Sequence, residues 1–82
     1  MRAMITIQFD DQRREEINSL IPKEQQHVRE LMTKGTLEAI YISADRTVVW
    51  VILKGDSQEQ IQQELSGFPL YPYMRPEITP LL

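Results

Sequence analysis

The 82-residue sequence contains no cysteine, which excludes a disulfide framework and a thiolate metal site. It has no excess of either charge, because 9 basic and 12 acidic residues give a net charge of −3 and are spread along the chain. This balance argues against an electrostatic nucleic-acid binder. No apolar run approaches the roughly 20 residues of a membrane span, and no signal peptide opens the chain. We therefore expect a soluble, cytoplasmic protein without a nucleic-acid or membrane partner.

The first third of the chain has the pattern of a strand followed by a helix. Apolar and polar residues alternate from Met4 to Phe9, the period of a strand with one buried face. Asp10 and Asp11 then occupy an N-cap position, and Gly35 suits the end of a helix. Apolar residues recur between them with helical spacing, at Ile17, Leu20, Ile21, Val28, Leu31 and Met32. Pro22 interrupts this pattern, so we expect a bent helix or two consecutive helices.

The rest of the chain completes a mixed pattern of strands and helices. Two strands are predicted at 36–42 and 47–53, with a short hairpin loop at 43–46. Asp56 and Glu59 resemble a capping box. The helix that they open ends near Gly67, a stretch with several prolines covers 68–76, and a last strand covers 77–82. The order strand, helix, strand, strand, helix, strand predicts a single α+β domain over residues 1–82. Its expected fold is ferredoxin-like, an antiparallel sheet with both helices on one face.

Residues 48–53 are six consecutive apolar residues, although a strand covered on one face should alternate apolar and polar residues. Both helices belong on one side of the sheet, and a chain of this size is marginally stable alone. We therefore expect the bare face, including Val48, Trp50 and Ile52, to pack against a second copy in a homodimer or a higher oligomer. The alternative is an exposed apolar patch, which is unusual on a monomer.

Glu24 lies on the apolar stripe of the long helix but carries a carboxylate. Burial raises the pKa of a carboxyl group toward the range useful for a general base. The alternative is a loosely packed helix in which Glu24 reaches solvent. His27 lies three residues further on nearly the same face and could relay a proton or orient Glu24, or simply border the core. One Glu-x-x-His pair is too little for a metal centre, so no metal is expected.

Several other side chains are candidates for ligand contacts. The aromatic and proline cluster 68–74 could line a pocket or form a rigid connection. Lys23, Arg46 and Arg75 could receive an anionic ligand or be ordinary surface charges. The chain has no glycine-rich phosphate loop, no Ser-His-Asp set and no cysteine nucleophile.

The end of the chain resembles the muconolactone isomerase family. The resemblance rests on Phe68-Pro69-Leu70-Tyr71-Pro72-Tyr73-Met74 and Glu77-Ile78-Thr79-Pro80-Leu81, and extends weakly through Glu30-Leu31 and Gly35. It implies a ferredoxin-like fold that assembles through dimeric α+β barrels. Lys23-Glu24 falls on a basic residue and a glutamate of the family's long helix, which implies that Glu24 is the proton-transfer base.

The chain also departs from the family pattern in the next strand. Leu37, Ala39 and Ile42 stand where the family has a tryptophan, a histidine and an arginine. His27 stands where the family tends to carry an aromatic residue. The pocket implied by the resemblance therefore lacks the family's histidine and its cation.

The resemblance implies an isomerase of aromatic catabolism that works without a cofactor. In that chemistry Glu24 removes the γ-proton of a small unsaturated lactone, gives a dienolate, and returns a proton to the α-carbon. Tyr41 and Tyr73 could donate hydrogen bonds to the developing oxyanion, and Lys23 or Arg75 could hold the carboxylate of the substrate. One alternative is a non-catalytic protein of the same fold that binds a small hydrophobic acid. A second is a cofactor-free oxygenase, because this fold alone does not decide the chemistry.

Overall fold

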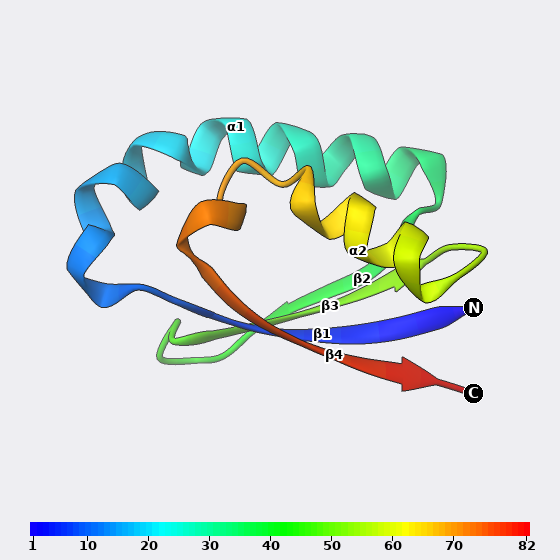
Figure 1. Ribbon diagram of the computed structural model, residues 1–82. Coiled ribbons are helices and arrows are strands. Elements are labelled where there is room, and N and C mark those ends of the chain that lie inside the picture. The colour runs from blue at the N-terminus through cyan, green and yellow to red at the C-terminus, as the bar shows by residue number, and fades with distance from the viewer.

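A computed structural model of residues 1–82 shows an antiparallel sheet with two helices on one of its faces (Figure 1). The strands are β1 (Arg2–Phe9), β2 (Leu37–Ile42), β3 (Val48–Lys54) and β4 (Met74–Leu81). The helices are α1 (Arg14–Lys34) and α2 (Gln58–Ser66), with short 3₁₀ helices η1 (Asp11–Arg13) and η2 (Tyr71–Tyr73). The strand order β2-β3-β1-β4 is compatible with a ferredoxin-like fold, and the predicted α+β class is confirmed.

The hydrophobic core lies between the helices and the face of the sheet that they cover. Ala3, Ile5 and Ile7 of β1 are buried there because they share one side of the pleat. They pair across the ladder with Leu53, Val51 and Val49 of β3. The helices add buried side chains to the same layer, namely Leu31, Ile61 and Leu65. No polar side chain is fully buried.

The opposite face of the sheet is covered by no element of the chain (Figure 1). Its central pairs are Met4 with Ile52 and Thr6 with Trp50, and Tyr41 of β2 lies beside Trp50. These side chains are half-buried, except Tyr41, which is 60% exposed. The pleat thus divides the apolar run of β3 between a covered face and an uncovered face.

Helix α1 runs without interruption from Arg14 to Lys34 with Pro22 inside it. Of the two expected forms, a bent helix or two consecutive helices, the second is therefore wrong. Ile17 and Val28 pack on the core on either side of Pro22. A proline removes one backbone hydrogen-bond donor. The packing of Ile17 and Val28 on the core keeps the helix continuous despite this missing hydrogen bond. The helix ends at Gly35 as predicted, with φ 81° and a hydrogen bond from its N–H to the Met32 carbonyl (3.1 Å).

Helix α2 is capped one residue later than predicted. The Ser57 hydroxyl accepts a hydrogen bond from the Gln60 N–H (3.2 Å). The Gln60 side chain in turn accepts one from the Asp56 N–H (2.6 Å). The capping pair is therefore Ser57 with Gln60, and the expected pair of Asp56 with Glu59 is wrong.

Strand β4 begins at Met74, three residues before the predicted position 77. It includes Pro76 and Pro80, which pair with Ile7 and Ala3 of β1. β4 is an edge strand, and an edge strand tolerates residues without an N–H donor. Neither helix of this fold has the length and apolar composition needed to cross a membrane.

Candidate functional site

The middle of α1 lies against the segment 67–73 that connects α2 with β4 (Figure 1). This segment folds back on itself, because the N–H of Tyr71 donates to the Phe68 carbonyl and that of Tyr73 to the Leu70 carbonyl, both at 2.9 Å. Phe68 and Leu70 are buried in the core. The segment therefore presents a fixed backbone to the helix face that carries the predicted base.

Glu24 lies at this contact and is half-buried. Its Oε1 accepts a hydrogen bond from the N–H of Leu70 (3.1 Å), 46 residues away in the sequence. Burial raises the pKa of the Glu24 carboxyl above its usual value, and the hydrogen bond from Leu70 opposes that rise without cancelling it. No cation forms an ion pair with Glu24. The site thus holds a carboxyl group with one oxygen fixed by the backbone and no compensating charge.

His27 lies one helical turn from Glu24 and meets the same segment. Its ring packs edge to face on Phe68, with the ring centroids 4.9 Å apart and the planes at 76°. The Nε2 atom of His27 is buried and has no hydrogen-bond partner. Glu24 and His27 are therefore the two predicted site residues that the fold brings together.

The aromatic and proline cluster holds this segment in place. Tyr73 is half-buried, and the guanidinium of Arg13 lies 5.2 Å from the centroid of its ring. The hydroxyl of Tyr71 accepts a hydrogen bond from Nε2 of Gln62 (3.1 Å). The N–H of Asp10 donates to the carbonyl of Tyr73 (3.0 Å). The cluster thus acts as a connection between α1, α2 and β4, one of the two roles considered from the sequence.

The remaining predicted residues form no hydrogen bond or ion pair with Glu24 within one chain. Tyr41 is on the uncovered face of the sheet, beside Trp50. Arg75 is exposed and donates from Nη2 to the Phe9 carbonyl (3.2 Å). Lys23 is exposed on α1, and Arg46 is exposed in the hairpin loop with φ 63°. No cation is thus placed beside the Glu24 carboxyl in one chain.

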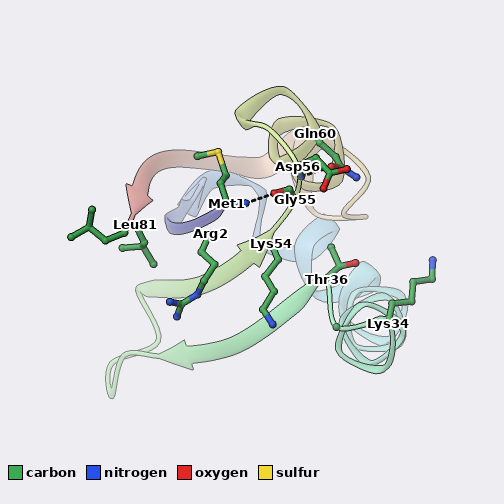
Figure 2. A pocket seen from close by; sticks show the side chains of 11 residues that line it. Met1, Arg2, Lys34, Thr36, Lys54, Gly55, Asp56, Gln60 and Leu81 are labelled. Atoms are coloured by element: carbon green, nitrogen blue, oxygen red, sulfur yellow. Dashed lines mark hydrogen bonds between the residues drawn. The ribbon is translucent and has the colours of Figure 1, made fainter.

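A surface hollow of about 450 Å³ lies at the far end of the sheet (Figure 2). Arg2, Lys34 and Lys54 contribute its cationic side chains. Arg2 and Lys54 are engaged by Glu38, at 2.6 and 3.5 Å, and Lys34 points outward. The hollow contains none of the residues predicted to form a site.

The chain contains no group of three or more histidine, aspartate or glutamate side chains arranged to hold a metal ion. No sequence pattern identifies the Leu70 N–H as the partner of Glu24, because every residue except proline carries such a donor. Only the fold shows which N–H reaches the carboxyl group.

Comparison with known proteins places the chain in a family. A family model described as muconolactone delta-isomerase matches residues 2–82, which is almost the whole sequence. A search of curated proteins finds no match. The match extends well beyond the terminal motif that carries the resemblance, and it is compatible with the α+β fold. The chain therefore belongs to the muconolactone delta-isomerase family.

Proposed function

We propose that this protein is an isomerase that shifts a proton within a small unsaturated lactone of the muconolactone type, without a cofactor. Membership of the family supports an isomerase-like function in general. The single observation that carries the specific proposal is the Glu24 carboxyl, half-buried and bonded to the Leu70 N–H. A general base works best when its pKa lies near the operating pH, and burial moves Glu24 in that direction.

The reaction needs one carboxyl group that acts twice. The Glu24 carboxylate takes the γ-proton of the lactone, and the electron pair of the broken C–H bond passes through the double bond to the ring carbonyl. The resulting dienolate takes the proton back from Glu24 at its α-carbon. The double bond has then moved by one position and Glu24 is a carboxylate again. No electrons are gained or lost.

Two further side chains have proposed roles at this site. Lys23 is exposed next to Glu24 in the sequence and is proposed to hold the carboxylate of the substrate at the entrance. Tyr73 is half-buried in the segment that contacts Glu24 and is proposed to border the bound substrate. Tyr41 and Arg75 contribute to the site of one chain only if a second copy brings them there.

Replacement of Glu24 by glutamine tests the proposal, because glutamine keeps the hydrogen-bond acceptor but cannot take a proton. We expect kcat for muconolactone to fall by about 10²–10⁴-fold, measured by proton NMR as the conversion of the vinylic α-proton signal of the lactone into an α-methylene signal. Glu30→Gln is the matched control, an exposed glutamate on the same helix, and it should keep the wild-type rate. Unchanged turnover by Glu24→Gln would reject the proposed role.

The second candidate function is a divergent relative that binds a small hydrophobic acid or lactone without turnover. It is favoured by the single hydrogen bond of Glu24, because no side chain bonds to or pairs with this carboxyl group to assist turnover. Wild-type protein that binds muconolactone in a calorimetric titration, but leaves its double bond in place, would select this function over the isomerase.

We also propose that two copies pair through the uncovered face of the sheet. Trp50, Met4 and Ile52 form an apolar surface there with no cover within the chain, and exposed apolar patches mark interaction sites. Analytical ultracentrifugation should show about twice the chain mass of 9.6 kDa. Trp50→Glu should shift the protein to the monomer, whereas Gln25→Glu on the outer side of α1 should not. A monomeric wild type at micromolar concentration would refute the pairing.

A further inference from the structure

The unpaired Nε2 of His27 is the strongest unexplained polar feature of the fold. This atom is buried without a hydrogen-bond partner, and it is the only buried side-chain nitrogen or oxygen in that state. Native proteins pair the large majority of such atoms, and an unpaired one calls for a specific explanation. A ligand that supplies the missing partner is such an explanation, because the atom lies beside the candidate base.

The position of His27 relative to Glu24 fits a shared ligand. The two residues are three apart on α1, a spacing that puts their Cβ atoms about 5–6 Å from each other on one face. Both meet the same short segment, since Glu24 accepts from the Leu70 N–H and His27 packs on Phe68. A small ligand that contacts the Glu24 carboxyl can therefore also contact the His27 imidazole.

We propose that His27 Nε2 carries a proton and donates a hydrogen bond to the ring carbonyl oxygen of the lactone. This inference rests on the proposed function. The carbonyl oxygen gains negative charge when Glu24 removes the γ-proton, so a donor aimed at it stabilises the dienolate more than the lactone. His27 is then a catalytic residue beside Glu24.

The carbonyl fits this position better than the carboxylate of the same ligand. The ring of Phe68 packs against the imidazole, and no polar group of the chain pairs with Nε2. No cation pairs with Glu24, so a second full negative charge beside it would be buried without compensation. A lactone carbonyl is neutral when it binds and becomes charged during the reaction. The ligand carboxylate then points toward solvent.

Other predicted donors are less well placed for this role within one chain. Tyr41 lies on the uncovered face of the sheet, and the ring of Tyr73 packs against Arg13. Ala39 and Ile42 have no hydrogen-bonding side chain. Among these candidates, His27 is therefore the one that carries an unpaired side-chain nitrogen on the helix face of Glu24.

Entry of the ligand requires a local movement. Nε2 is buried, so the proposal requires that the side chains covering it move aside when the lactone binds. The ring of Phe68, which packs edge to face on the imidazole, is the neighbour proposed to move.

Nitrogen-15 NMR of the wild-type protein tests the hydrogen bond directly. His27 is the only histidine, so its two ring nitrogens give the only imidazole signals. The probes are a saturated γ-lactone bearing an acetate group, which cannot react, and the cyclic ether of the same shape, which lacks the carbonyl. We expect the lactone to shift the Nε2 signal and the ether to leave it in place. Equal shifts with both probes, or none with the lactone, would overturn the proposal.

Two variants separate this role from a structural one. His27→Phe keeps a ring on Phe68 but removes the donor, and we expect kcat to fall by about 10²–10³-fold while KM changes little. His27→Gln keeps an N–H donor at nearly the same reach and should recover at least a tenth of the wild-type kcat. Circular dichroism confirms that both variants are folded. Wild-type kcat in His27→Phe would overturn the proposal.

The outcomes also distinguish this inference from the proposed function. If the lactone shifts the Nε2 signal but wild-type protein gives no turnover, the hydrogen bond stands and the isomerase function fails. If turnover depends on Glu24 but neither the NMR signal nor His27→Phe responds, the function stands and the role of His27 fails.

Discussion

Replacement of Glu24 by glutamine should change how the stability of the protein depends on pH. The Glu24 carboxyl is half-buried, and its pKa is raised by burial and partly lowered by the hydrogen bond from Leu70. The folded chain therefore holds the Glu24 proton more tightly than the unfolded chain. Relative to the glutamine variant, the wild type is most stable below the unfolded-state pKa of about 4.3. It loses stability as the pH rises from there through the folded-state pKa.

The loss of stability has an upper limit, because only one proton is released. One titrating group changes the free energy of unfolding by at most about 1.4 kcal/mol per pH unit. The slope for Glu24 lies below this limit, because the side chain is partly exposed and solvent screens its charge. The hydrogen bond from Leu70 contributes little to the difference at low pH, because the protonated carboxyl and the glutamine amide both offer a neutral oxygen acceptor.

Urea denaturation followed by far-ultraviolet circular dichroism measures this effect between pH 3.5 and 8. The protein concentration is kept constant, because any association would contribute to stability. The free-energy difference between Glu24→Gln and wild type should grow in favour of the variant as the pH rises, and then level off. Glu30→Gln serves as the exposed control on the same helix. Parallel curves for wild type and Glu24→Gln would refute the reasoning that burial raises the pKa.

Two further predictions concern the ends of the helices that frame the site. Ser57→Ala should destabilise the protein by about 1 kcal/mol in urea because it removes the cap of α2, whereas Asp56→Ala keeps the backbone N–H that Gln60 binds and should be nearly neutral. Gly35→Ala should cost about 1 kcal/mol, because φ is 81° there and nothing lies within 4 Å of an added Cβ, so the cost is conformational. Gly67→Ala is the control, with φ −82°, and thermal denaturation should show no loss. Equal effects at the two glycines, or at Ser57 and Asp56, would contradict these assignments.

The element order was predictable because hydrophobic period and turn residues agree along most of the chain. The boundaries of the elements were less predictable. Asp56 with Glu59 and Ser57 with Gln60 are two capping patterns offset by one residue, and only the observed hydrogen bonds decide between them. Pro22 does not divide the helix, because the apolar residues on both sides of it pack on one sheet and tertiary packing outweighs the loss of one backbone bond.

Glu24 was predictable as a candidate because a carboxylate on an apolar stripe is visible in the sequence. The environment of Glu24 was not predictable from the sequence. The partner of its Oε1 is a backbone donor 46 residues away, and the unpaired Nε2 of His27 depends on which side chain packs beside it. Both facts follow from the path of the segment 67–73 under α1, which periodicity does not reveal.

The placement of Tyr41 shows how one extra residue in a strand can move a candidate side chain to the other face of the sheet. In a regular strand Leu37, Ala39 and Tyr41 would share one face, because side chains alternate with a period of two. Leu37 is buried under the helices, so Tyr41 would then face the layer that contains Glu24. The register instead shifts between Leu37 and Ala39, and Tyr41 pairs with Trp50 on the uncovered face. A bulge of this kind moves every later side chain to the other side of the sheet. The same irregularity that withdraws the tyrosine from Glu24 adds an aromatic ring to the face proposed for pairing. We propose that the oxyanion donor comes instead from the helix side, where His27 has an unpaired nitrogen.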